Sequence, residues 1–293
     1  MSQPSSSQPI LIGVLSGALV VAVSAAIFFY FKLNQTVKTE NPPKEPILVT
    51  PANTQASVSQ VAIDVPTPNK VDAFNTLFGV NTKHGKIKTA KYKISSIWFD
   101  KKLTYGTDTI YVVFTLTYNL NEATGDIDSC HACAPEIGAI TYKKQANEWA
   151  VISKQPSFTS FGSWGEAGDV KPEPLLLSKL TTSFLLDTSY SSTGMLTSGK
   201  TIFSFADDTW RDLGNITTEE NNAGACDETV PPTDEFYRKC WAYEGKISIV
   251  PKQNTQYPDL LVTRTGTFSE GDTVKNQLYK FDGKSYVDAT IYK

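Results

Sequence analysis

Residues Ser129 to Glu136 read SCHACAPE, which places Cys130 and Cys133 three positions apart around His131. The chain of 293 residues contains four cysteines and two histidines. Two thiols at this spacing can bind a metal, anchor a haem, exchange electrons or form a disulfide. The compartment in which the domain folds decides between these possibilities, because thiols are oxidised outside the cytoplasm.

Haem attachment and redox catalysis fit this segment poorly. Covalent haem attachment requires C-x-x-C-H, whereas Ala134 follows Cys133. A thioredoxin-like pair needs its first cysteine at a helix N-terminus, where the helix dipole lowers the thiol pKa. Here Pro135 follows, and the surrounding residues read as a loop between strands. We therefore expect no cofactor.

Two interpretations of the four cysteines remain, namely one zinc site or two disulfides. A zinc site would use Cys130, Cys133, Cys226 and Cys240, but the second pair lies fourteen residues apart and lacks a zinc-knuckle spacing. The even number of cysteines and an oxidising compartment favour the disulfides Cys130 to Cys133 and Cys226 to Cys240, with no metal. The second would close a loop of about 15 residues and contribute roughly 3 kcal/mol in the chain-entropy model.

A phosphate-binding motif matches letter for letter at Gly194 to Thr201, which reads GMLTSGKT. A P-loop works only between a strand and a helix, because the backbone N–H groups and the helix dipole face the phosphates. Here Ile202 to Phe205 continue as a strand, so we interpret the motif as a Gly/Ser turn between strands.

Other catalytic patterns are weak. The nucleophile pattern G-x-S-x-G is absent, and His84 and His131 lie in a polar segment and in the cysteine loop. Thirty Asp and Glu residues leave room for an unlocated glycosidase carboxylate pair. Enzyme activity is therefore not predicted, but a hydrolase stays open as the alternative.

The N-terminus predicts a membrane anchor. Ile10 to Phe31 are 22 uncharged, mostly apolar residues, which as a helix would cross a hydrocarbon core of about 30 Å. We assign residues 1–9 to a short tail and 10–32 to one transmembrane helix. Gly13 and Gly17 form G-x-x-x-G, through which two such helices could pair as a homodimer.

Two signals disagree about the side of the membrane on which the C-terminal domain lies. Lys32, Lys38 and Lys44 follow the span, and the positive-inside rule would place the C-terminal part in the cytoplasm. This rule is weaker for long translocated domains, and the lysines are mixed with Glu40 and Glu45. The cysteines favour a periplasmic domain anchored in the inner membrane.

Behind the span, the chain divides into a linker and one domain. Residues 33–69 are rich in Pro, Thr and Ser without sustained periodicity, which is typical of a linker. Residues 70–293 have a size that one β-rich domain can fill. The net charge of −3 and the lack of a basic run argue against nucleic acid as a partner.

The domain shows an apolar period of two rather than 3.6, as in β-strands. Three segments repeat an aromatic-containing strand, a polar turn and an aromatic that opens a second strand: AITYKKQANEWAVI (139–152), TIFSFADDTWRDLG (201–214) and QLYKFDGKSYVDAT (277–290). With the runs at 93–99, 111–118, 157–162, 183–190, 246–251 and 259–264, they predict three four-stranded antiparallel meanders in an all-β domain. These could pack as an open propeller-like fragment or as a sandwich.

The last set, DLLV followed by LYKFDGKSYV, resembles a degenerate FG-GAP repeat of β-propellers. The resemblance covers about a quarter of the chain and implies a propeller-like blade. The Asp-rich calcium turn of that family is missing here, so the resemblance implies no bound ion. The span, the linker and the cysteines separately indicate a bacterial-type envelope protein.

Two loops are candidates for recognition. FGSWGEAGD (161–169) places Trp164 between glycines, and NNAGAC (221–226) runs toward Trp241. A loop tryptophan either plugs the core or binds a ligand, and the amides of Asn221 and Asn222 could orient that ligand. We predict a membrane-anchored binding or protein-interaction module for an envelope protein or glycan, with an envelope hydrolase acting on glycan or peptide as the alternative.

Overall fold

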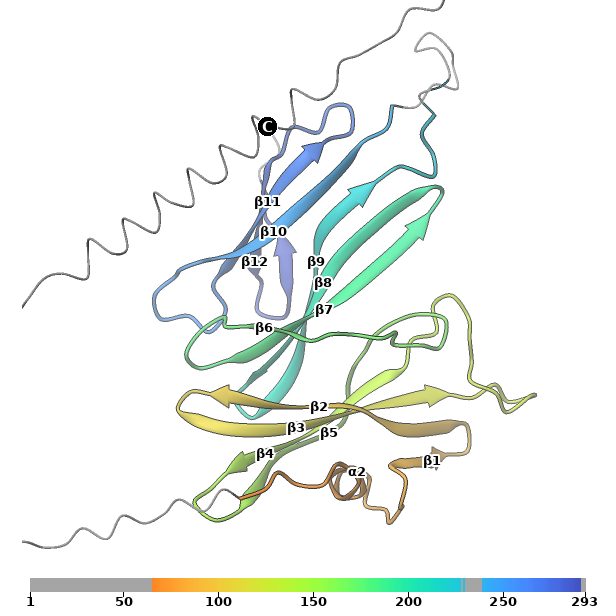
Figure 1. Cartoon of the computed structure of the whole chain (residues 1–293), viewed down its shortest axis with the longest axis vertical. Helices are drawn as coiled ribbons and strands as arrows, with labels where there is room; N and C mark the ends of the chain where they lie inside the picture. Colours follow the sequence, from red (N-terminus) through yellow and green to blue (C-terminus); the bar gives the residue numbers. More distant parts are fainter. Residues whose placement is uncertain (1–64, 228, 230–238, 291–293) are drawn as a thin grey trace, which may run out of the picture. The chain divides into compact units, whose positions relative to one another are not determined.

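The computed structural model describes residues 65–227, 229 and 239–290, and the domain is built of antiparallel β-sheets with one short helix (Figure 1). All of these residues belong to the unit Val61–Lys293. The predicted span and most of the predicted linker lie outside the described residues. Within the described residues, no helix has the length and apolar character needed to cross a bilayer.

The first sheet is a five-stranded meander in the order β1-β2-β3-β4-β5. Its strands are β1 (Lys86–Ala90), β2 (Lys93–Tyr105), β3 (Asp108–Asn119), β4 (Glu136–Lys144) and β5 (Trp149–Ser160). Helix α2 (Lys70–Phe78) packs on one face, where Ala73 and Leu77 meet Val113 and Ile140. The side chain of Asn69 caps the helix N-terminus.

The second sheet has eight strands in the order β13-β12-β11-β10-β9-β8-β7-β6. The strands are β6 (Glu173–Leu175), β7 (Thr182–Ser192), β8 (Met195–Ala206), β9 (Thr209–Asn221), β10 (Ala242–Val250), β11 (Asp259–Thr267), β12 (Asn276–Phe281) and β13 (Tyr286–Asp288). The sheet encloses a core of its own, in which Ile202 and Leu213 pack with Leu260 and Tyr279. The turn between β8 and β9 has positive φ at both Asp207 and Asp208, as in a type I′ hairpin.

A third, aromatic core joins the two sheets. Phe114 on β3 lies 4.9 Å from Trp210 on β9 and 5.4 Å from Phe184 on β7, between ring centroids. Strand β3 is buried on both faces, because Phe114 points to this core while Val113 points to α2. Burial on both faces explains why residues 111–116 read as a nearly continuous apolar run rather than as an alternation.

The prediction of three four-stranded meanders is wrong in its grouping. Residues 157–162 do not begin a new set, because β5 continues to Ser160 and stays paired with β4 through two register shifts. The second and third predicted sets form one sheet, because Glu219–Asn221 of β9 pair with Ala242–Glu244 of β10. The prediction of an all-β antiparallel domain is confirmed.

Candidate recognition site

Trp164 sits at the tip of a tight loop after β5. Phe161 and Ala167 on either side of it are buried in the core between the sheets. Gly162 has φ +102, and a Cβ there would lie 1.9 Å from the carbonyl oxygen of Glu166, so the loop requires glycine at this position. The two ends of the loop are therefore anchored in the core, while its tip, which carries Trp164, is exposed to solvent. The Trp164 side chain is 58 % exposed, which excludes the core-plug reading for the described domain.

The cysteine loop is fastened to the Trp164 loop. Cys130 and Cys133 form a disulfide, as the sequence predicted. The Gly165 amide donates to the Cys133 carbonyl at 2.7 Å, and the Phe161 amide donates to the Pro135 carbonyl at 3.1 Å. The C-x-x-C pair is therefore a structural staple that holds the backbone against which the tryptophan loop rests.

An exposed aromatic cluster results, formed by His131, Trp164 and Tyr190. The rings of His131 and Trp164 lie 5.0 Å apart with an interplanar angle of 33°, and those of His131 and Tyr190 lie 5.7 Å apart. Tyr190, on β7, is 55 % exposed. Large aromatic side chains gathered at a surface are typical of binding sites rather than of ordinary protein surface. Trp164 was predicted from the sequence and Tyr190 was not, because its only signal there is an aromatic residue at the polar end of a strand.

The backbone of Trp164 is strained. Its φ of 55° lies in the left-handed region, which residues other than Gly, Asn and Asp rarely adopt. A non-glycine residue held there costs on the order of 1–3 kcal/mol, and such strain gathers at functional sites. A glycine would fit without strain, so the presence of tryptophan points to a use for its side chain.

Asn222 and Trp241, by contrast, join two chain segments near the second disulfide, Cys226–Cys240. The Asn222 side chain donates from Nδ2 to the Lys239 carbonyl at 2.9 Å and accepts from the Trp241 amide at 2.8 Å. Asn222 is 8 % exposed, and these bonds occupy its side chain within the domain. Both predicted disulfides are confirmed.

The two predicted recognition loops approach the same hairpin without touching each other directly. The Gly224 amide donates to the Gly194 carbonyl at 3.0 Å, which brings the NNAGAC loop onto the β7–β8 turn. Tyr190 lies near that turn on β7 and contacts the Trp164 loop through His131. In the described part of the chain, no ring contact or hydrogen bond joins Trp164 to the Asn222 loop. Asn221 accepts a hydrogen bond from the Ala223 amide at 3.2 Å.

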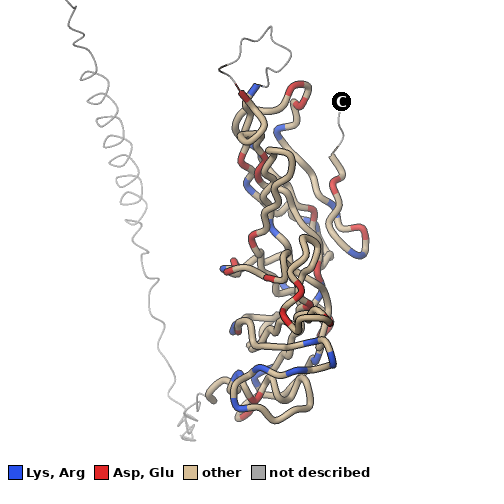
Figure 2. The backbone as a smooth tube through the Cα atoms, turned by 90° about the vertical axis from the view of Figure 1, so that its right-hand side faces the viewer, with Lys and Arg blue, Asp and Glu red and all other residues tan. Residues whose placement is uncertain are grey.

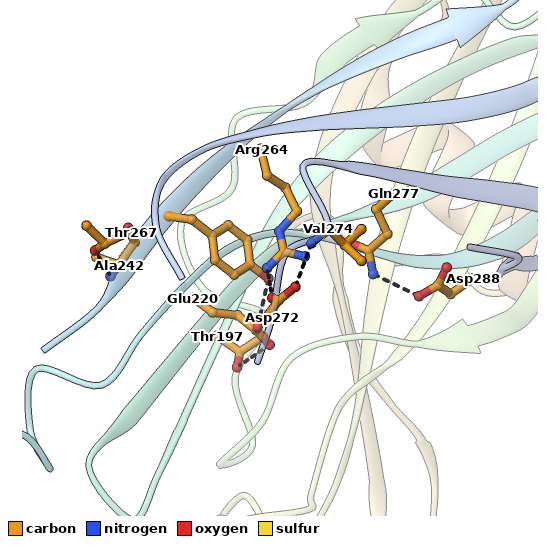
Figure 3. Close-up of polar contacts among 10 residues, drawn as sticks. Thr197, Glu220, Ala242, Arg264, Thr267, Asp272, Val274, Gln277 and Asp288 are labelled. Atoms are coloured by element: carbon orange, nitrogen blue, oxygen red, sulfur yellow. Dashed lines mark hydrogen bonds and ion pairs between the residues drawn. The ribbon is translucent and has the colours of Figure 1, made fainter. Parts of the chain in front are cut away.

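A buried polar cluster, which the sequence analysis missed, surrounds Arg264 on β11 (Figure 3). Its guanidinium lies 3.7 Å from the centroid of the Tyr243 ring and bonds Asp272 at 2.6 Å. The Tyr243 hydroxyl donates to Glu220 at 2.7 Å, and burial together with this carboxylate raises the pKa of Tyr243. Burial works against ionised Asp272, but the Val274 amide and Arg264 outweigh it and lower the pKa of the Asp272 carboxyl. An ion pair and a ring contact hold the guanidinium, as in a structural cluster, and its Nε has no hydrogen-bond partner among the described residues.

Two surface hollows lie elsewhere. One, of about 640 Å³, runs between β5, β9 and the β12–β13 turn. Its carboxylate, Asp212, accepts hydrogen bonds from the Thr159 hydroxyl and the Gly214 amide, both at 2.8 Å. The other, of about 680 Å³, lies beside the β1–β2 turn and has Glu122 and Asp128 in its lining. A carboxylate pair for the hydrolase alternative would be sought there.

The P-loop-like motif belongs to the β7–β8 hairpin. Only Gly194 lies in the turn, and Met195 to Thr201 form the first half of β8, so the predicted turn is shorter than the motif. Lys200 bonds Asp187 at 2.7 Å and Glu173 at 3.1 Å across neighbouring strands. A strand therefore follows the motif where a phosphate site would need a helix.

Comparisons of the chain with protein families, with curated proteins and with solved structures found no match.

Proposed function

We propose that this protein is a binding module of the bacterial cell envelope, anchored in the inner membrane by residues 10–32 and recognising its partner through the aromatic cluster. One observation carries the proposal: an exposed tryptophan, Trp164, is held in a left-handed backbone conformation by a disulfide-stapled loop. Strain and exposure both reduce stability, and binding gives a reason for retaining them.

The rigidity of the site supports this proposal. Buried Phe161 and Ala167 fix the ends of the Trp164 loop, and the Cys133 carbonyl fixes its tip. An aromatic side chain that is ordered before binding loses little conformational entropy on binding, and such residues are frequent hot spots. The two disulfides support an oxidising compartment, which agrees with a periplasmic domain.

The alternative of an envelope hydrolase needs a carboxyl group with a raised pKa to act as the acid. The carboxyl groups of Asp272 and Asp282 have shifted pKa values, and both are lowered. For Asp282, backbone amides of Ser285 and Lys284 hold the ionised form. These two groups therefore favour the ionised state, which is the opposite of what an acid catalyst requires.

The experiment compares Trp164→Ala, Trp164→Gly and Leu180→Ala in the full chain. Leu180 is another exposed apolar side chain, 63 % exposed, and serves as the control. Capture of envelope proteins and of purified cell-wall glycan is quantified for each variant, together with the melting temperature. Both Trp164 variants should weaken binding by about 2 kcal/mol or more, as expected for a hot spot.

Stability separates this proposal from a structural role. Trp164→Ala should leave the melting temperature nearly unchanged, and Trp164→Gly should raise it, because glycine relieves the positive φ. Binding that is retained by both Trp164 variants would refute the proposal. A hydrolase would instead show turnover of glycan or peptide that is lost in Glu122→Gln or Asp128→Asn.

A further inference from the structure

One edge of the eight-stranded sheet is left unpaired beside the aromatic cluster. Strand β7 pairs with β8 from Thr182 to Ser192 without a register shift. On its other side, β6 pairs only with Ser183–Leu185. From Leu186 to Ser192, no strand in the described ranges covers this edge (Figure 1).

Three other edge strands carry features that discourage an added strand. Strand β1 has lysines at Lys86 and Lys88 and a register shift. Strand β5 contains Pro156 and has two register shifts. Strand β13 is three residues long. Charged side chains, proline, bulges and short length are the known ways in which proteins protect an edge against unwanted pairing.

The β7 edge has none of these from Thr188 to Ser192, which read TSYSS. Asp187, next to it, is bonded to Lys200. The hydroxyl of Thr188 is buried and has no hydrogen-bond partner among the described residues. A regular, uncharged and unprotected edge is a template for an extended polypeptide, which pairs with it through main-chain hydrogen bonds.

The charge around this edge identifies the chemistry of the partner. Residues 103–142, 155–170 and 180–199 contain no Lys or Arg, whereas residues 70–105 contain eight lysines and two aspartates. Figure 2 shows Lys and Arg gathered toward the lower end of the described tube. Glu166, which follows Gly165 in the loop, is exposed, and the backbone of Asp128 lies against Gly165. Glu166 thus places a carboxylate two residues from Trp164, and the segments that carry His131, Trp164 and Tyr190 contain no Lys or Arg.

We propose that the β7 edge from Asp187 to Ser192 takes up an extended, Lys- or Arg-containing segment of a partner protein as an added strand. Cationic side chains of that segment lie against the rings of Trp164 and Tyr190, where cation–π attraction adds to the attraction of the acidic loops. A second copy of this chain is a poorer occupant, because it would bring two acidic surrounds together. This inference rests on the proposed function and names the partner class for the same site.

The test uses the full chain in detergent and three peptide probes of about eight residues, the length of a typical strand. The first alternates Val and Lys, the second alternates Val and Glu, and the third is the Val-Lys peptide N-methylated at every residue. The third keeps the side chains and the charge but lacks every N–H donor. Binding is measured by fluorescence of the aromatic cluster, and amide hydrogen exchange is followed along the chain.

The Val-Lys peptide should bind and slow exchange by about tenfold or more at alternate amides of Asp187–Ser192, because those that do not face β8 gain partners. The other two peptides should bind at least about tenfold more weakly. Equal binding of the N-methylated peptide, or protection confined to residues 129–134 and 161–167, would overturn the strand addition but leave the recognition site intact. In the absence of peptide, protection of β7 that increases with protein concentration would identify a second copy of the chain as the occupant. This result would also overturn the proposed binding of a cationic segment.

The two proposals fail differently. Suppose that Trp164→Ala leaves capture of the native partner unchanged while the Val-Lys peptide still protects β7. The aromatic cluster is then not the recognition site, but the β7 edge remains a binding site. If the native partner binds through Trp164 but no peptide protects β7, the edge proposal is wrong.

Discussion

The side chain of Gln155 bonds both backbone polar groups of Trp210. Its Nε2 donates to the Trp210 carbonyl at 3.0 Å, and its Oε1 accepts from the Trp210 amide at 2.7 Å. The Trp210 indole in turn donates to the Thr141 hydroxyl at 2.8 Å. Gln155 and Thr141 belong to the five-stranded sheet and Trp210 to the eight-stranded sheet. Three hydrogen bonds to one residue therefore fix how the two sheets meet, which in turn positions the loop that follows β5.

Replacing Gln155 by Leu should destabilise the domain by about 1–3 kcal/mol, because the backbone groups of Trp210 lose their partners. Urea unfolding measures the change, and Gln145→Leu in the exposed β4–β5 turn is the matched control. An equal and small effect of both substitutions would show that the Gln155 bonds contribute little to stability.

Replacing Asn222 by Ala should lower stability by about 1–3 kcal/mol, because the Lys239 carbonyl and the Trp241 amide lose a partner. Binding to the native partner should remain unchanged. The neighbouring Asn221→Ala removes only a local turn contact and should have the smaller effect on stability. If Asn222→Ala instead weakens binding while thermal melting is unaltered, the ligand-orienting role predicted for the amide is supported.

Replacing Arg264 by Ala should destabilise the domain by about 3–5 kcal/mol, because Asp272 loses its buried ionic partner and the Tyr243 ring loses its cation. Arg211→Ala, at an exposed arginine, is the control and should lie within about 0.5 kcal/mol of the wild type. Chemical unfolding at neutral pH measures both. A near-neutral Arg264→Ala would mean that the cluster is dispensable.

The same pair predicts a dependence on acid. The pKa of Asp272 is lower in the folded domain than in the unfolded chain, so its contribution to stability is complete above about pH 4, the ordinary value for Asp. The contribution is lost as the pH falls below this value through the folded pKa. Arg264→Ala should therefore flatten the fall in stability below pH 4, measured from urea midpoints. An unchanged slope in that variant would place the acid-sensitive carboxyl elsewhere.

Local chemistry determined much of the secondary structure. The period-two pattern predicted the β-strands, because alternate side chains of a strand point to opposite faces. The turns at Asp207 to Asp208 and around Gly283 were visible as polar breaks between aromatic strands. The even cysteine count indicated both disulfides, because cysteines of a domain that folds in an oxidising compartment are usually paired.

The tertiary structure decided how the strands are grouped. Whether β5 ends at Ile152 or continues to Ser160 depends on register shifts against β4, and the junction of β9 with β10 depends on three residue pairs. Neither feature has a local signature. Burial of aromatic side chains from both sheets in one shared core selects this grouping over three separate blades, because apolar surface is buried wherever complementary faces meet.

Some features of the candidate site could likewise be predicted from the sequence, and others only from the tertiary structure. The glycines around Trp164 predicted a tight loop from the sequence, since glycine alone tolerates those backbone angles. The contacts of His131 with Trp164 and with Tyr190 join residues more than thirty and more than fifty positions apart. Such contacts follow from chain topology, and no spacing rule encodes them. The role of Asn222 was also decided in three dimensions, because an amide that can bind a ligand can equally satisfy the backbone beside it.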